Sequence, residues 1–219
     1  TKITLGDAEL GGLAEMRGPM AESGAPPAWF VYTAVEDVDA AAAAAKDSGG
    51  GAINEPFDIP DVGRMAILTG AEGEAFAVWG RHSKHVGADR VPNDKHGAFC
   101  WGEMGSHDPE KARGFYAKVF AWQAETSPMG DQGDYTTFKV DEETPAAGMY
   151  EMPPEMARVP AHWLPYFTVD DVDAILAKAE GMGAAQVCPA TEAPGVGRFV
   201  ILRDPQGANV ALIQLEMQE

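Results

Sequence analysis

A short stretch that occurs twice decides the fold of this 219-residue chain. Residues 162–174 read HWLPYFTVDDVDA, and residues 28–40 read AWFVYTAVEDVDA. Each begins with aromatic and β-branched residues and then reaches an Asp before good helix formers, which predicts a strand followed by a capped helix. Residues 28–80 and 162–214 align without a gap and are identical at 18 of 53 positions. Because this period is too long for a solenoid of small units, the match indicates duplicated domains.

A third copy of the same pattern lies between the two repeats. Residues 98–106 predict a strand, Asp108-Pro109 predicts a helix start, and Gly and Pro residues then separate three further strands. Residues 1–16 match residues 137–152 and predict only a hairpin. We therefore expect a first unit that is incomplete, with roughly 40 residues preceding Thr1. The complete strand–helix–strand–strand–strand units are expected at 28–80, 98–152 and 162–216.

The order of these units predicts the fold class and the domains. Tandem βαβββ units predict an α+β fold with mixed sheets. We expect two domains, residues 1–80 and residues 98–219, each formed by a pair of units, of which the first is incomplete. Residues 81–97 are polar, contain Pro92 and lack periodicity, so they are interpreted as a linker.

Composition excludes several classes of partner. The chain carries 34 acidic and 16 basic side chains, which gives a net charge of −18. Nucleic acid and anionic membranes are not expected as partners, because their phosphates would be repelled. No apolar run is long enough to predict a transmembrane helix. Cys100 and Cys188 do not make a disulfide framework, so the cytoplasm is the simplest location.

Several motifs resemble the vicinal-oxygen-chelate superfamily, which groups glyoxalase I, bleomycin-resistance proteins and extradiol dioxygenases. They are EMGSHDP at 103–109 with FY and VFAW within 115–122, VDDVD at 169–173, and DPQGAN at 204–209. The layout is similar to a two-domain subgroup with four such units, labelled glyoxalase-like or hydroxylase. The resemblance covers nearly the whole chain and implies curved mixed sheets around a cleft. It specifies the fold more than the activity, since the superfamily contains several reactions and pure binders.

The resemblance also implies where a divalent metal would bind. Catalytic members carry a His or Gln seven residues before the helix-capping Asp, and a Glu two residues after the Asn of the last turn. The corresponding residues are Trp101, Leu164 and Ala211 in the second domain, and Phe30 and Ala77 in the first. None of these side chains is a suitable donor to a divalent ion. We therefore expect no metal and no other cofactor.

Strand alternation predicts which side chains face the cleft. They are aromatic with a few polar groups, as in pockets for small molecules. Ordinary core packing of the aromatic residues is the open alternative. The residues predicted to bind a ligand are Phe30, Tyr32, Trp101, Leu164, Tyr166, Thr168 and Asn209, joined by His162, which has the same strand parity as Leu164.

Glu103 is the candidate catalytic residue. Its carboxylate lies among the aromatic residues of the predicted cleft, where it would suit a general base or bind a cation. An exposed carboxylate, or one paired with a nearby Arg, is the alternative. Arg64 and Arg198 occupy equivalent positions of the repeat. This repetition favours a structural ion pair with an Asp at a helix start over a contact with substrate.

Three functions remain open at this point. The preferred one is a metal-free protein that binds a small apolar or aromatic molecule in an aromatic-lined cleft. The alternative is a glyoxalase-, dioxygenase- or hydroxylase-type enzyme, a lyase or oxidoreductase. It would use a divalent metal held by non-standard ligands such as Glu103 and His162, or Glu103 alone as a general base. The third is a structural or regulatory homodimer without a ligand.

Overall fold

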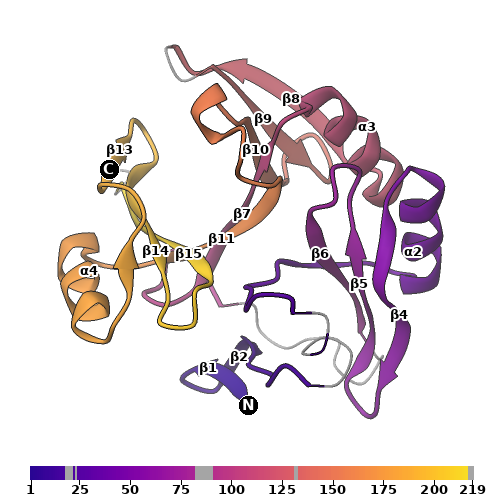
Figure 1. The fold of residues 1–219 in the computed structure, drawn as a ribbon, viewed down its shortest axis with the longest axis horizontal. Coiled ribbons are helices and arrows are strands. Elements are labelled where there is room, and N and C mark those ends of the chain that lie inside the picture. The colour runs from indigo at the N-terminus through magenta and orange to yellow at the C-terminus, as the bar shows by residue number, and fades with distance from the viewer. Residues whose placement is uncertain (18–21, 23, 82–90, 131–132, 217–219) are drawn as a thin grey trace. The chain divides into compact units, whose positions relative to one another are not determined.

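The computed structural model describes residues 1–17, 22, 24–81, 91–130 and 133–216, apart from the side chain of Arg81. Its contacts group into two compact units, whose elements are shown in Figure 1. Unit A comprises Phe30–Gly87 and Trp101–Leu164, and unit B comprises Thr1–Trp29, Ala88–Cys100 and Pro165–Glu219. The expected domain boundaries stay a prediction, and residues 82–90 of the expected linker lie outside the described residues.

The first module of unit A contains one helix and four strands. β3 (Tyr32–Ala34) precedes α2 (Val38–Asp47), and β4 (Gly51–Ile59), β5 (Gly63–Thr69) and β6 (Ala75–Arg81) follow. The strand order is β3-β6-β5-β4, in which only the β3–β6 pair is parallel. The aromatic and β-branched residues at 29–35 favour a longer strand, but the ladder of β3 with β6 covers only three residues.

The second module of unit A repeats this order. β7 (Phe99–Ser106) is followed by α3 (Pro109–Phe120), β8 (Gln123–Pro128), β9 (Asp134–Lys139) and β10 (Pro145–Glu151). β7 pairs in parallel with β10, while β10, β9 and β8 form an antiparallel meander. A 3-10 turn, η3 (Pro154–Met156), then leads to β11 (His162–Thr168).

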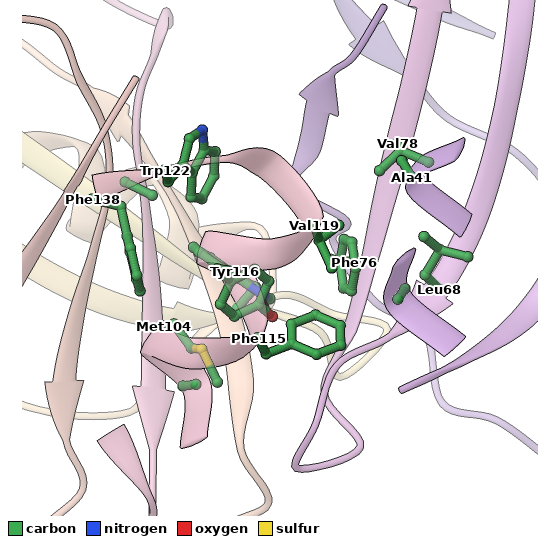
Figure 2. Close-up of a cluster of buried hydrophobic side chains, with 14 of the residues drawn as sticks. Ala41, Leu68, Phe76, Val78, Met104, Phe115, Tyr116, Val119, Trp122 and Phe138 are labelled. Carbon is green, nitrogen blue, oxygen red and sulfur yellow. Dashed lines mark hydrogen bonds between the residues drawn. The ribbon is translucent and has the colours of Figure 1, made fainter. Parts of the chain in front are cut away.

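The two modules of unit A share one apolar core, in which α2 contacts α3. Alanines such as Ala41 and Ala45 line the buried face of α2, and their small side chains let the two helices approach. Figure 2 shows Phe115 and Val119 of α3 close to Phe76 of β6. The Phe76 and Phe115 ring centroids lie 6.0 Å apart in an edge-to-face arrangement, which is the preferred geometry of aromatic pairs.

Unit B contains the N-terminal hairpin and the last module. β1 (Lys2–Leu5) and β2 (Ala8–Gly12) form the hairpin expected within residues 1–16. After β11 come α4 (Val172–Gly181), β12 (Ala185–Gln186), β13 (Thr191–Ala193), β14 (Gly197–Arg203) and β15 (Asn209–Leu215). The order is β12-β14-β15-β11, and β13 also pairs with β14. The residues at 185–189 favour a strand, but β12 ends at Gln186, and Pro189, which has no backbone N–H to donate, stops the ladder before β13.

The three helices described above each begin at an Asp that accepts a backbone hydrogen bond. Asp37, Asp108 and Asp171 accept from the N–H three residues later, at 2.9, 3.1 and 2.9 Å respectively. These caps satisfy N–H groups that no carbonyl of the helix can reach. Asp37 and Asp108 are caps, as their places before the helix formers predict, and the third helix is capped by Asp171 and not by the neighbouring Asp170.

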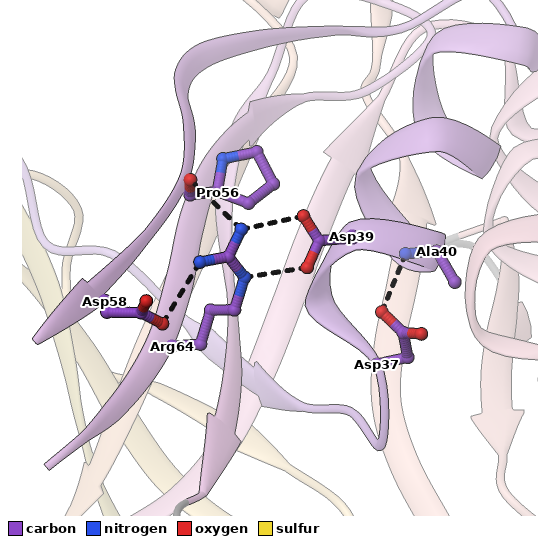
Figure 3. Close-up of polar contacts among 6 residues, drawn as sticks. All are labelled: Asp37, Asp39, Ala40, Pro56, Asp58 and Arg64. Carbon is purple, nitrogen blue, oxygen red and sulfur yellow. Dashed lines mark hydrogen bonds and ion pairs between the residues drawn. The ribbon is translucent and has the colours of Figure 1, made fainter.

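The repeated arginines form structural ion pairs, as predicted. Arg64 donates from Nε and Nη2 to the two carboxylate oxygens of Asp39, at 2.7 and 2.8 Å, and from Nη1 to Asp58 at 3.0 Å (Figure 3). The hydrogen bond from Arg64 lowers the pKa of Asp39. In the last module, Arg198 donates to Asp173 at 3.0 Å. Each pair therefore ties the start of a strand to the first turn of the helix in its own module.

The predicted α+β class, with tandem βαβββ modules and mixed sheets, is confirmed. Within the described ranges, no helix combines the length and the apolar character that crossing a bilayer requires.

Candidate functional site

The two faces of β7 have different surroundings in unit A. Met104 and Ser106 are fully buried on the face that meets the apolar core. Trp101 and Glu103 lie on the opposite face, because side chains alternate along a strand, and both are half-buried. An aromatic ring and a carboxylate thus stand side by side outside the core.

Tyr135 of β9 joins these two side chains in a hydrogen-bonded chain. Trp101 donates from its indole Nε1–H to Tyr135 Oη at 2.9 Å, and Tyr135 donates from its hydroxyl to Glu103 Oε1 at 3.0 Å. An indole N–H can only donate and a carboxylate can only accept, so the direction of both hydrogen bonds is fixed. Burial and the negative charge of Glu103 raise the pKa of Tyr135. Its hydroxyl therefore keeps its proton and remains a donor near neutral pH.

The space that Tyr135 occupies exists because residue 148 is a glycine. Gly148 lies on β10 between β7 and β9, directly opposite Glu103. A Cβ atom at Gly148 would lie 1.8 Å from Tyr135 Oη and 2.7 Å from Trp101 Nε1. Nonbonded carbon and oxygen atoms do not approach so closely. The hydrogen-bonded chain therefore requires that no side chain is present at this position.

Gly148 occupies a position equivalent to one where the superfamily that the chain resembles carries a metal ligand. The strand register shows this equivalence. Ala77 and Ala211 occupy the position at which that resemblance implies a metal-binding Glu. Each of Ala77, Gly148 and Ala211 lies 40 residues after the Asp that caps the helix of its module. The register agrees in all three modules, in which the facing pairs are Tyr32 with Ala77, Glu103 with Gly148, and Tyr166 with Ala211. The constant spacing could have identified Gly148 from the sequence.

The residues around Glu103 do not fit the divalent metal of that superfamily. Trp101 occupies one ligand position and Gly148 another, and the hydroxyl of Tyr135 fills the space above the glycine. In the part of the chain that the structure describes, no group of three or more His, Cys, Asp or Glu side chains is arranged to hold a metal ion. Such a group is the minimum that metal centres in proteins normally use.

Gly105 of β7 likewise makes room for two more polar side chains. A Cβ atom at Gly105 would lie 3.0 Å from Tyr150 Oη and 3.1 Å from His162 Cε1. The Nδ1 atom of His162 lies 2.8 Å from the carbonyl oxygen of Pro160. Because a carbonyl only accepts, Nδ1 carries a proton, and Nε2 is the acceptor when the ring is neutral. His162 therefore lies beside β7, two residues along the strand from Glu103.

The other predicted residues of unit A lie in different surroundings. Leu164 is only 4% exposed. Phe30 is half-buried, and Tyr32 is 50% exposed. Tyr32 pairs with Ala77 of β6, so it belongs to the β3–β6 sheet and not to the sheet of β7. These residues do not extend the hydrogen-bonded chain around Tyr135.

Tyr166, Thr168 and Asn209 belong to unit B. Tyr166 is buried with its ring centroid 6.0 Å from that of Phe199, and the buried Thr168 hydroxyl donates to the carbonyl oxygen of Asn93. Asn209 is exposed and accepts from Arg203 Nε at 3.3 Å. Core packing therefore describes the surroundings of Tyr166. A role in ligand binding for these residues stays a prediction.

Unit A also contains a buried polar cluster that the sequence does not reveal. Glu74 directly precedes β6 and is 2% exposed. Its carboxylate accepts from Tyr116 O–H at 2.6 Å and from the N–H of Glu72 at 3.0 Å. Tyr116 in turn accepts from Trp163 Nε1–H at 2.8 Å. Burial raises the pKa of Glu74. An acidic pair in a Gly-containing turn normally predicts a solvated loop, which hid this cluster.

The same turn covers the start of α3. The Glu72 carboxylate accepts from Ser106 O–H at 2.5 Å and from the N–H groups of His107 and Asp108, at 2.8 and 3.1 Å. A carboxylate is favourable there, because the N-terminus of a helix carries a partial positive charge. The turn between β5 and β6 thus fixes where the helix of the second module begins.

A pocket of about 350 Å³ also lies at the start of α3. It is on the face of β9 and β10 that meets the helix, since the buried Thr136 and Met149 form part of its wall. None of the residues predicted to bind a ligand lines it. The described residues around it are His107, Asp108, Pro109, Glu110, Arg113, Asp134, Thr136, Met149 and Glu151.

Comparison with known proteins agrees with this fold. A family model for the Glyoxalase/Bleomycin resistance protein/Dioxygenase superfamily matches residues 103–212. The chain is 35% identical over 201 residues to "Putative glyoxylase CFP32" of Mycobacterium tuberculosis, covering 92% of this chain and 75% of that protein. It is 34% identical over 196 residues to "Anthracycline biosynthesis protein DauV" of Streptomyces sp. strain C5, covering 89% of this chain and 68% of that protein.

A solved structure has the same fold at lower sequence identity. The Mn(II)-bound glyoxalase from Novosphingobium aromaticivorans aligns with a TM-score of 0.52 and 16% identity. The alignment covers 86% of this chain and 65% of that chain, which is less than two thirds of the solved chain. The βαβββ modules, the sequence motifs and the relatives lead to one assignment. The chain belongs to the glyoxalase/bleomycin resistance protein/dioxygenase superfamily.

Proposed function

We propose that the chain binds a small apolar or aromatic molecule beside Trp101, Glu103 and Tyr135, without a divalent metal. The observation that carries this proposal is the glycine at position 148. A metal-binding carboxylate of the superfamily would start there, yet Tyr135 Oη lies 1.8 Å from where its first side-chain atom would be. Two ligand positions have thus become part of an aromatic and hydrogen-bonding surface.

The surface has the composition of a small-molecule site. Trp101 offers a large half-buried ring, and Glu103 and Tyr135 supply polar groups next to it. Sites for small molecules combine apolar walls with a few fixed polar groups. The hydrogen bonds of Tyr135 hold both partners in place before a ligand arrives, which lowers the conformational entropy lost on binding.

The proposal is tested by metal analysis and ligand binding on the same purified chain. We expect elemental mass spectrometry to find far less than one divalent metal per chain. We also expect equilibrium dialysis to show that 2-naphthol binds with the same affinity before and after treatment with EDTA. Trp101→Ala should weaken this binding at least about tenfold, because it removes most of the apolar contact. One bound metal per chain, together with loss of binding after EDTA treatment, would overturn the proposal.

A second candidate is metal-free acid–base catalysis with Glu103 as the general base. Two observations favour it: the fixed orientation of the Glu103 carboxylate by Tyr135, and a relative named as a glyoxylase. In such a reaction Glu103 takes a proton from carbon next to a carbonyl group and later returns it.

This candidate predicts hydrogen exchange at carbon. Hydroxyacetone in D2O should exchange its C–H hydrogens faster with the protein than without it, as measured by proton NMR. Glu103→Gln should reduce that acceleration by about 10²-fold or more, because general acid–base catalysis contributes rate factors of that size. Equal exchange with the wild type and with Glu103→Gln would contradict a catalytic role for Glu103.

A further inference from the structure

The turn between β5 and β6 is hydrogen-bonded to the second module at two separate places. At the end of β7, Glu72 accepts from the Ser106 hydroxyl at 2.5 Å and from the backbone N–H of His107 at 2.8 Å. On α3, Glu74 accepts from the Tyr116 hydroxyl at 2.6 Å. Ser106 and Glu74 are both buried, where a polar group without a partner is costly. The turn is therefore held firmly at both places.

The first contact leads to His162 through the backbone that precedes β11. The Nε2 atom of the His107 ring lies 2.8 Å from the carbonyl oxygen of Val159. The Nδ1 atom of His162 lies 2.8 Å from the carbonyl oxygen of the next residue, Pro160. Both ring nitrogens donate, because a carbonyl only accepts. Since the proline ring restricts the backbone between the two carbonyls, the position of His107 influences the orientation of the His162 ring.

The second contact leads to the residue that follows His162. Tyr116 donates to Glu74 and accepts from Trp163 Nε1–H at 2.8 Å. Tyr116 and Trp163 are buried, and their ring centroids lie 5.3 Å apart in an edge-to-face arrangement. Trp163 directly follows His162 at the start of β11. Two hydrogen-bonded paths that begin at one turn of the first module thus end at adjacent residues of the second.

We infer that Glu72 and Glu74 are positioning residues for the ligand site of the second module and act by holding His162. This inference rests on the proposed function and deepens it by naming what controls the site. His162 lies beside the site strand β7, since a Cβ atom at Gly105 would lie 3.1 Å from its Cε1 atom. A side chain that is held in place before binding loses less conformational entropy when a ligand arrives.

The test uses two substitutions on the first path. Glu72→Gln puts an amide NH2 group in place of one accepting oxygen, and His107→Ala removes a ring donor from an exposed residue. We expect each to weaken 2-naphthol binding in equilibrium dialysis by about threefold or more, the size of effect of residues that act on a site from a distance. Each should also shift the ring signals of His162 in proton–carbon NMR spectra, which His162→Gln identifies by their loss.

The double variant shows whether the two residues act along one path. If they do, Glu72→Gln with His107→Ala should weaken binding no more than the stronger single substitution, whereas independent effects would multiply. Glu110→Gln is the charge-matched control, because it removes an exposed carboxylate from the first turn of α3, where Glu110 pairs with Arg113. We expect it to leave the affinity and the His162 signals as in the wild type.

The outcomes separate this inference from the proposed function. Unchanged affinity in Glu72→Gln and His107→Ala, His162 signals that neither substitution moves, or effects that multiply in the double variant would overturn the inference and leave the proposed function standing. If Glu72→Gln does not fold, His107→Ala decides alone, because residue 107 is exposed. Failure of the wild type to bind 2-naphthol would overturn the proposed function, while the His162 signals would still test the hold of the turn on this ring.

Discussion

The absence of a side chain at Gly148 leaves the space in which Trp101, Tyr135 and Glu103 form their hydrogen bonds. Gly148→Ala would place a methyl group 1.8 Å from Tyr135 Oη, so Tyr135 must move and its hydrogen bonds with Trp101 and Glu103 must break. We expect the free energy of unfolding to fall by about 1–3 kcal/mol, as for other overpacked sites, and binding of 2-naphthol to weaken. Chemical denaturation and dialysis measure the two effects.

Gly114→Ala is the matched control for this substitution. Gly114 lies inside α3, and a Cβ atom there would meet no atom within 4 Å. Alanine is the better helix former, so we expect a gain of about 0.5–1 kcal/mol. If Gly148→Ala behaved like Gly114→Ala, Tyr135 would not occupy the space assigned to it.

Glu74 gives the stability of the chain a dependence on pH. Burial raises its pKa in the folded state, so the folded chain binds this proton more tightly than the unfolded chain does. The contribution of Glu74 to the free energy of unfolding therefore decreases as pH rises from its unfolded pKa, about 4.3, through its folded pKa. Glu74→Gln should remove this decrease, as urea denaturation at several pH values between 5 and 8 would show.

The control is Glu142→Gln, which makes the same substitution at an exposed residue. We expect it to leave the pH dependence of stability as in the wild type. A wild-type profile that Glu74→Gln does not alter would show that the Glu74 carboxylate has its ordinary pKa in the folded chain.

At the scale of single residues, the sequence predicted which side chains are neighbours only where they lie on the same strand. Alternation along β7 placed Trp101 and Glu103 on one face. Tyr135 could not be assigned to them, because that requires knowing that β10 lies between β7 and β9 and that residue 148 leaves a gap. Glu74 was hidden for a related reason, since its partner Tyr116 comes from α3, and Tyr116 in turn accepts from Trp163 of β11.

At the scale of elements, the repeated Arg–Asp pairs tie each helix to its own sheet. Arg64 binds Asp39 through two hydrogen bonds, whereas one hydrogen bond joins Arg198 to Asp173. Double-mutant cycles with Arg→Met and Asp→Asn should give a larger coupling free energy for the first pair than for the second. Both couplings should decrease in high salt, because the pairs are partly exposed.

The coupling between Arg198 and Asp173 should be weaker than the coupling between Arg64 and Asp39. An equal or stronger coupling would show that the number of hydrogen bonds does not determine the strength of the pair. Stability of each single and double variant can be measured by thermal and chemical denaturation in low and high salt. The exposed pair Lys2 and Glu9, which involves no helix, serves as the control for these cycles.

The elements themselves could largely be predicted from the sequence, because their signals are local. Asp before a run of helix formers located all three helix starts, and Gly and Pro located most turns. The exception near Pro189 shows the limit of this approach. A run of apolar residues predicts a strand, but a missing backbone N–H interrupts the ladder there.

At the scale of the whole molecule, the shared core predicts that two modules of unit A unfold together. Phe76 of the first module contacts Phe115, Tyr116 and Phe120 of α3 through its ring. Phe76→Ala should cost about 3–5 kcal/mol and reduce hydrogen-exchange protection in both α2 and α3.

Leu202→Ala provides the comparison, because Leu202 belongs to the separate apolar cluster of unit B with Val172 of α4. We expect its largest loss of protection in α4 and in β14. Loss of protection in α2 alone after Phe76→Ala would contradict a shared core. Mass spectrometry of exchanged peptides resolves these segments, and it would also test the domain boundaries proposed from the repeat.

The repeat predicted the modules and a pairing of them into domains, but not the packing of α2 against α3. The apolar face of a helix does not indicate which other element covers it. The contact between α2 and α3 depends on side chains from distant parts of the chain. Long-range packing of this kind leaves no periodic signal in one sequence.

The glycine at position 148 also sets an order in which substitutions can accumulate. A carboxylate side chain cannot enter this position while the Tyr135 hydroxyl occupies it, so Gly148→Glu is unfavourable in the present background. Replacement of Tyr135 alone is not sufficient, because a Cβ atom at this position would also lie 2.7 Å from Trp101 Nε1. Trp101 must therefore also move or be replaced, for example by His, before position 148 can hold a carboxylate. The three positions are therefore epistatic, because the side chain at each one limits which side chains the other two can hold.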